Sequence, residues 1–129
     1  SAKEVMTPRT SMFALEGEKT INEIWDEITE NGFSRIPVYE ETIDNIIGIL
    51  YVKDLMEHVK NNELEIPIKQ IVRSAYFVPE TKNVNELFNE MQSEKKHIAI
   101  LIDEYGGFSG IVTFTVPLKF PLLLRVPGE

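Results

Sequence analysis

The sequence predicts an α+β fold built from two copies of one β-α-β-β-α unit that pack together with pseudo-twofold symmetry. The first observation is an internal repeat, since residues 34–51 align without a gap with residues 96–113 at an offset of 62. The second is that residues 20–28 match residues 83–91 at an offset of 63. A unit of about 60 residues buries its apolar faces poorly by itself. The two copies are therefore expected to pack sheet against sheet.

Each repeat contains a predicted helix that starts with a capping signal. The helices begin at Thr20 and Asn83, two residue types that cap helices, and each cap is followed three residues later by a glutamate, as in a capping box. Apolar residues then recur at the spacing i, i+3, i+4, i+7, which gives each helix one apolar face. These residues are Ile21, Ile24, Trp25 and Ile28 in the first helix and Val84, Leu87, Phe88 and Met91 in the second.

Short runs rich in β-branched residues follow each helix and predict two buried strands per repeat. They cover residues 36–39 and 46–51 in the first repeat and residues 98–102 and 108–114 in the second. The turn DEYGG at residues 103–107 contains two glycines. Glycine permits positive φ, so this turn lets the second strand return close to the first.

The remaining segments set the predicted domain boundaries. Residues 52–60 predict one more helix, because Leu55, Met56 and Val59 share one side. The corresponding helix of the second repeat is expected to be missing, because prolines interrupt the end of the chain and proline breaks helix interiors. The predicted organisation is a first repeat at residues 1–60, a linker at 61–70, a second repeat at 71–116 and a divergent tail at 117–129 that replaces the expected last helix.

The composition excludes several kinds of site. The net charge is -8, which argues against nucleic acid but leaves room for one small phosphorylated ligand held by a local basic cluster. There is no cysteine, and the two histidines, His58 and His97, show no metal-ligand spacing, so no metal site is expected. No apolar run reaches the roughly 18 residues that span a bilayer. No nucleophile–base arrangement is visible either, so we do not expect an enzyme.

Four segments carry a resemblance to a known family. They read VMTPRTSMFAL (residues 5–15), GFSRIPVYEETIDNIIGILYVKDL (32–55), AYFVPET (75–81) and HIAILIDEYGGFSGIVT (97–113). Together they resemble a tandem pair of CBS domains, also called a Bateman module. The DEYGG and SRIPVY segments are most similar to the CorC/HlyC branch, the hemolysin-like and CNNM-related proteins of magnesium and cobalt efflux.

The resemblance implies a fold of two CBS repeats and a regulatory role. Such pairs bind an adenosine nucleotide, AMP or ATP with or without Mg, in clefts between the repeats. They form homodimers and act as a cytoplasmic domain attached to the membrane domain of a parent protein in the cell membrane. The alternative for this chain is a structural dimerisation module whose nucleotide clefts stay empty.

The family motif at the end of each repeat is Gly, apolar, any, Thr or Ser, any, any, Asp. Its carboxylate can accept both hydroxyls of a ribose, and its hydroxyl can reach a phosphate at a helix start. The first repeat keeps the carboxylate as Asp54 but has Tyr51 at the hydroxyl position. The second repeat keeps the hydroxyl as Thr113 but has Val116 at the carboxylate position. We therefore expect the Asp54 cleft, with its helix intact, to be the one that holds a nucleotide.

The resemblance also implies three further contacts to the ligand. Thr7 stands where the family places a threonine against the nucleotide of the Thr113 cleft. Arg35 and His97 align with each other just before the central strand of each repeat, a position that contacts phosphate. A guanidinium offers a fork of donors that suits phosphate, whereas His97 donates as a neutral or protonated ring.

Each of these residues also has a purely structural explanation that the sequence leaves open. Asp54 suits the start of any helix through the helix dipole. Thr7 can cap a turn, Thr113 can be a β-branched strand residue, Arg35 can pair with an acid, and His97 can be a half-buried polar residue. The acids Glu40, Glu41, Asp44, Asp103 and Glu104 line the two hairpin turns and are expected to be solvated rather than metal ligands.

Overall fold

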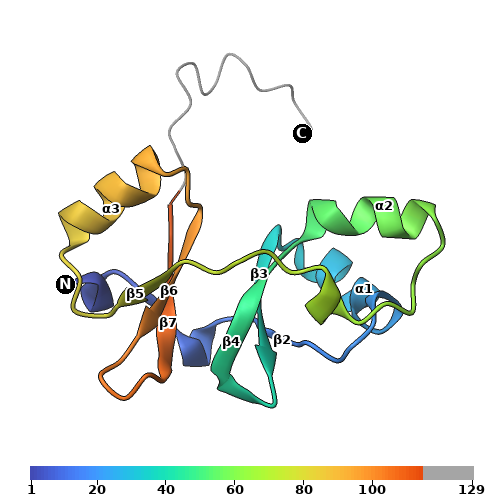
Figure 1. Cartoon of the computed structure of the whole chain (residues 1–129), viewed down its shortest axis with the longest axis horizontal. Coiled ribbons are helices and arrows are strands. Elements are labelled where there is room, and N and C mark those ends of the chain that lie inside the picture. The colour runs from blue at the N-terminus through green and yellow to red at the C-terminus, as the bar shows by residue number, and fades with distance from the viewer. Residues whose placement is uncertain (115–129) are drawn as a thin grey trace.

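The computed structural model describes residues 1–114. The predicted divergent tail at 117–129, in place of a last helix, lies outside the described residues. Two sheets stand side by side with helices on their outer faces (Figure 1). The first sheet has the order β2-β3-β4, and the second has the order β1-β7-β6-β5. The strands are β1 (Thr7–Pro8), β2 (Leu15–Glu16), β3 (Arg35–Glu40), β4 (Thr42–Tyr51), β5 (Phe77–Pro79), β6 (Ile98–Ile102) and β7 (Phe108–Thr113).

The helices form where their apolar spacing predicts them, and two of the three follow a capping side chain, Thr20 or Asn83. They are α1 (Ile21–Asn31), α2 (Leu55–Lys60) and α3 (Val84–Ser93), with short 3-10 helices η1 (Ala2–Glu4), η2 (Arg9–Ser11), η3 (Val52–Asp54) and η4 (Ile68–Gln70). The capping box of α1 is present, since Glu23 N donates to Thr20 Oγ1 over 3.3 Å and Thr20 N donates to Glu23 Oε1 over 3.0 Å. Gly32 ends this helix with a φ of 67°.

The two repeats pack sheet against sheet through a shared apolar cluster, as the sequence predicts. Ile46 and Ile49 from β4 meet Ile98 and Ile100 from β6 and Phe108 from β7, and all five side chains are buried. Each repeat also has a core of its own between its sheet and its helices. The predicted α+β fold with two packed repeats is thus confirmed.

Two segments cross from one repeat to the other and pair with a strand there. The N-terminal strand β1 pairs antiparallel with β7, with Thr7 opposite Ile111. The segment after η4 crosses in the same way to β4, where Arg73 and Ile49 exchange two backbone hydrogen bonds of 2.9 Å each. The first residues therefore lie in space with the second repeat, although they precede the first repeat in sequence. The domain boundaries expected from the sequence stay a prediction.

The structure corrects the gap-free alignment of the two repeats. Arg35 lies opposite Tyr51 across β3 and β4, whereas Ile98 lies opposite Thr113 across β6 and β7. Tyr51 and Thr113 are equivalent, so the structural equivalent of Arg35 is Ile98. The expectation that Arg35 and His97 occupy matching positions is wrong by one residue. A shift of one residue along a strand moves a side chain to the opposite face of the sheet.

Backbone hydrogen bonds confirm the corrected alignment. Val52 N donates to Ser34 O over 3.0 Å, and Phe114 N donates to His97 O over 2.9 Å, so Ser34 is the equivalent of His97. The physical cause is the length of the hairpins. The first hairpin has one more residue than the second between matching pairs, and the pairing of β3 with β4 has an additional register shift between Tyr39 and Glu40.

Candidate functional site

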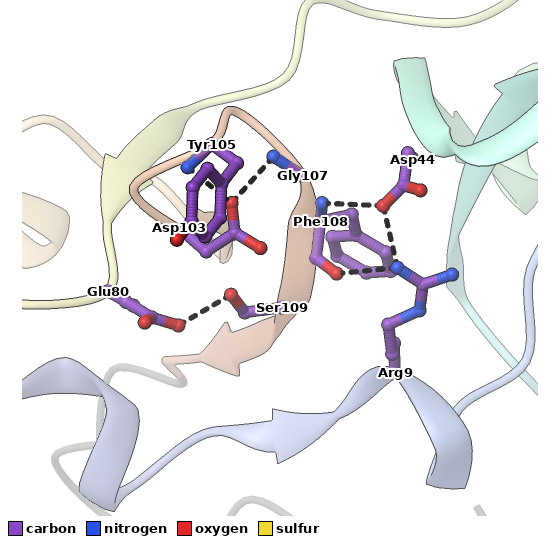
Figure 2. Close-up of polar contacts among 8 residues, drawn as sticks. All are labelled: Arg9, Asp44, Glu80, Asp103, Tyr105, Gly107, Phe108 and Ser109. Carbon is purple, nitrogen blue, oxygen red and sulfur yellow. Dashed lines mark hydrogen bonds and ion pairs between the residues drawn. The ribbon is translucent and has the colours of Figure 1, made fainter.

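Polar contacts join the two repeats at the hairpin end of the molecule (Figure 2). Arg9 Nη1 donates to Asp44 Oδ1 over 2.6 Å and to Phe108 O over 3.1 Å, and Phe108 N donates to the same Asp44 oxygen over 3.1 Å. The backbone N–H of Phe108, and then the Arg9 guanidinium, hold the pKa of Asp44 below its usual value. Because these groups satisfy one another, this end of the molecule has a structural role.

The DEYGG turn belongs to the same structural end. Asp103 Oδ1 accepts hydrogen bonds from Tyr105 N (2.9 Å) and Gly107 N (2.8 Å), as Figure 2 shows. Gly106 has a φ of 80°, as expected for a glycine in this turn. A Cβ on Gly107 would lie 3.0 Å from Asp103 Oδ2 and 3.1 Å from an Asp44 oxygen, so the second glycine provides space. In residues 1–114 no three His, Cys, Asp or Glu side chains are grouped to hold a metal ion.

A basic cleft lies between the repeats at the opposite ends of β4 and β7. Its cavity has a volume of about 300 Å³. The cationic side chains of Arg73, Lys95 and Lys96 gather here, in a chain whose net charge is -8. We call this cavity the Tyr51 cleft; it is lined by Ile49, Tyr51, Arg73, Ser74, Tyr76, Lys95, Lys96, His97 and Ile98. Such a cluster of cations next to aromatic rings suits an anionic ligand that also has a flat ring.

Asp54 and Arg73 form the strongest polar contact of this region. Arg73 Nε donates to Asp54 Oδ2 over 2.7 Å and Arg73 Nη2 donates to Oδ1 over 2.8 Å, which is a bidentate pair. The guanidinium also lies over the ring of Tyr51, with Cζ 4.2 Å from its centroid. The hydrogen bonds from Arg73 lower the pKa of Asp54, and those to Asp54 raise the pKa of Arg73. Asp54 makes no side-chain hydrogen bond to the start of α2, so its partner is Arg73 rather than a helix end.

Arg73 is the residue of this region that sequence reasoning missed. The motif at the end of each repeat does not include it, because it lies on the crossing segment. The repeat pattern gives no signal for it, since the residue that matches Arg73 is Thr7, and the other arginine that bonds across the repeats is Arg9. Both arginines pair with an aspartate of the first repeat, but at opposite ends of β4.

Arg35 and His97 line two different cavities that share Tyr51. His97 is half-buried and lines the Tyr51 cleft. Arg35 is exposed, with Cζ 5.5 Å from the centroid of the Tyr51 ring, and in the described part of the chain no acid lies within ion-pair distance of it. It lines an adjoining cavity of about 330 Å³ together with Phe33, Ser34, Tyr51, Val52 and Lys53. The structure thus brings Arg35, Asp54 and His97 around Tyr51.

Thr7 and Thr113 form a separate pair at the edge of the second sheet. Thr7 lies opposite Ile111, and Thr113 lies two residues further along β7, so both side chains share one face and both are exposed. The pairing of Thr7 with Ile111 matches the pairing of Arg73 with Ile49. A guanidinium thus lies beside β4, and a hydroxyl lies at the equivalent place beside β7. Val116 lies outside the described residues.

The comparison with known families decides the identity of the chain. The sequence model of the CBS domain matches residues 2–61 and again residues 65–115. The chain is a tandem pair of CBS domains. It belongs to the CBS domain family, which is not a catalytic family, and this confirms the resemblance that its sequence carries.

The CBS pair is similar to parts of longer proteins. It is 41% identical over 115 residues to a UPF0053 protein of Mycobacterium bovis, covering 87% of this chain and 26% of that protein. It is 40% identical over 111 residues to the magnesium and cobalt efflux protein CorC of Salmonella typhimurium, covering 86% of this chain and 38% of that protein. The chain therefore spans well under half the length of these relatives. In the described part of the CBS pair, no helix has both the length and the apolar character needed to cross a membrane.

A solved relative extends the likeness to the structure. The CBS domain of a bacterial CNNM/CorC family Mg²⁺ transporter, in complex with ATP, has a TM-score of 0.81 and 39% sequence identity. The match covers 86% of this chain and 79% of that chain. The similarity to the CorC branch therefore holds in sequence and in fold.

Proposed function

We propose that this CBS pair binds an adenosine nucleotide in the Tyr51 cleft and regulates the membrane domain of a longer CorC-type protein for magnesium or cobalt transport. The observation that carries the proposal is the gathering of Arg73, Lys95 and Lys96 in one cleft of an acidic chain. The solved relative that holds ATP supports the choice of ligand. In the parent protein the CBS pair would be a cytoplasmic domain.

The cleft, together with the Asp54 carboxylate that is bonded to its lining residue Arg73, offers a separate group for each part of a nucleotide. The cations would hold the phosphates, and the Asp54 carboxylate would accept the ribose hydroxyls. Tyr76 provides an aromatic wall beneath Lys96, whose Nζ lies 5.8 Å from the ring centroid. Nucleotide occupancy would then favour one orientation of the repeats, because the cleft is lined from both of them.

Nucleotide is proposed to bind in the Tyr51 cleft, next to Asp54, rather than in the cleft expected at Thr113. Losing a hydrogen-bonded ionised partner costs about 1.5–3 kcal/mol, roughly a ten- to hundredfold loss in affinity. Calorimetry with AMP, ADP and ATP, with and without Mg²⁺, should show affinities in the micromolar to millimolar range. Asp54→Ala should weaken binding by about that factor, whereas Thr113→Ala should leave it unchanged. Loss of binding in Thr113→Ala alone would reverse the assignment.

A second candidate function is a structural homodimerisation module with empty clefts. It is favoured by the Asp54–Arg73 pair, in which the proposed ribose acceptor already has a partner within the chain. In that case calorimetry would detect no binding of any adenosine nucleotide. Light scattering would still give a mass of twice 14.8 kDa.

A further inference from the structure

The backbone of Arg73 is fixed against β4, whereas its side chain is held by the Asp54 carboxylate and the Tyr51 ring alone. Its N–H and C=O groups both bond to Ile49, and its carbonyl oxygen lies against Gly48, so its Cα has one fixed place beside β4. The side chain is 46% exposed and rests on one face of the Tyr51 ring. The guanidinium can therefore change its partner by rotation of the side chain while the backbone stays in place.

We propose that Arg73 is a specificity-determining residue that makes the Tyr51 cleft select phosphorylated ligands over the neutral nucleoside. This inference rests on the proposed binding of an adenosine nucleotide. Without ligand, the guanidinium covers both oxygens of Asp54, at 2.7 and 2.8 Å. A ligand can bind the Asp54 carboxylate only when Arg73 moves away from it. A phosphate on that ligand gives Arg73 a new anionic partner.

The selection follows from the hydrogen-bonding capacity of the two side chains. A ribose diol and a bidentate guanidinium compete for the same two oxygens of Asp54. A nucleoside that displaces Arg73 leaves the guanidinium without an acid, whereas a nucleotide gives it phosphate oxygens in the fork geometry that it prefers. Lys95 and Lys96 line the same cavity and add attraction for the phosphate.

The exposure of the pair keeps the effect moderate. The side chains of Arg73 and Asp54 are 46% and 26% exposed, and exposed ion pairs are weak. Releasing Asp54 should therefore improve nucleoside binding by roughly three- to fivefold. Losing the contact to phosphate should weaken nucleotide binding by about tenfold or more. The ratio of the two affinities is the quantity that changes most.

The test is calorimetry of adenosine and AMP with the wild-type chain and with Arg73→Met, which keeps the length of the side chain but has no donor. We expect Arg73→Met to bind adenosine about threefold or more tightly and AMP about tenfold or more weakly. Arg9→Met is the matched control, since Arg9 also pairs with an aspartate, Asp44, but at the hairpin end. It should leave both affinities unchanged. Arg73→Lys, which keeps the charge without the fork, should fall between wild type and Arg73→Met.

Two results would overturn the inference in different ways. If the wild type binds AMP and Arg73→Met changes adenosine and AMP by the same factor, Arg73 does not select the ligand, although the proposed function stands. If no variant binds either ligand, the proposed function fails and the inference fails with it. If a thermal melt shows that Arg73→Met is poorly folded, the ratio of AMP affinity to adenosine affinity is compared between Arg73→Lys and wild type instead. An unchanged ratio in Arg73→Lys would then overturn the inference.

Discussion

The substitution Gly48→Ala should both destabilise the fold and disrupt the Tyr51 cleft. A Cβ at Gly48 would lie 2.6 Å from Arg73 O and 2.7 Å from Val72 Cγ2. The first of these atoms is backbone, so it cannot move away by a side-chain rotation. The crossing segment would have to leave β4 and take Arg73 with it.

The magnitude follows from the contacts that must shift. Overpacking a tight site costs about 1–3 kcal/mol, and each of the two hydrogen bonds between Ile49 and Arg73 contributes about 1 kcal/mol if it is lost. Alanine recovers about 0.5–1 kcal/mol through the lower entropy of the unfolded chain. A net loss of roughly 1–3 kcal/mol should lower the Tm by about 4–12 °C for a chain of 129 residues.

The matched control is Gly110→Ala at the equivalent position of the second repeat. There a Cβ would meet the backbone of Thr7 and Pro8, so a similar loss of stability is expected. Thermal melts should therefore fall for both variants, but calorimetry should show weaker binding of AMP for Gly48→Ala alone. A Gly48→Ala variant with the wild-type Tm and wild-type affinity would refute the account of the crossing segment.

Three further predictions concern pH and assembly. Because Arg73 lowers the pKa of folded Asp54, this carboxylate contributes stability above the unfolded value of about 3.9, and the contribution is lost as the pH falls through the folded pKa. Urea unfolding between about pH 2 and 5 should therefore lose less stability in Asp54→Asn than in wild type. Burial, followed by the hydrogen bond to Glu90, raises the pKa of Tyr76 to about 12. Stability should accordingly fall between about pH 10 and 12, and Tyr76→Phe should flatten this fall, as thermal melts can measure. Finally, light scattering should show a homodimer, and a monomer at high concentration would contradict that expectation.

The helices, the strands and the packing of the repeats could be predicted because their signals are local. The cap at Thr20 and the apolar stripe of the first helix appear in α1 as written in the sequence. The strand expected at 46–51 is longer in the structure, where β4 begins at Thr42 within the hairpin. The expectation that placed Arg35 and His97 in matching positions failed because a gap-free alignment cannot show a difference of one residue in hairpin length.

The contacts of the candidate site could not be predicted, because they depend on segments that are distant in sequence. Asp54 was found from its motif, yet its partner Arg73 comes from the crossing segment after the linker. Nothing in the motif says which backbone will cross β4. The same holds at the hairpin end, where Arg9 reaches Asp44 and Phe108 from the start of the chain. Periodicity predicts which face of an element is buried, but not which remote side chain covers its end.

The two crossing segments carry different groups, so the two clefts should not behave as copies of each other. The crossing segments place Arg73 beside Ile49 and Thr7 beside Ile111, so a cation and a neutral hydroxyl occupy equivalent positions. A phosphate near Arg73 gains a charge-assisted, bidentate partner, whereas one near Thr7 gains a single neutral hydrogen bond, which is about half as strong. The carboxylate of the first repeat is covered by a cation from the segment that crosses β4. In this way an acidic chain can attract a phosphate strongly at one cleft and only weakly at the other.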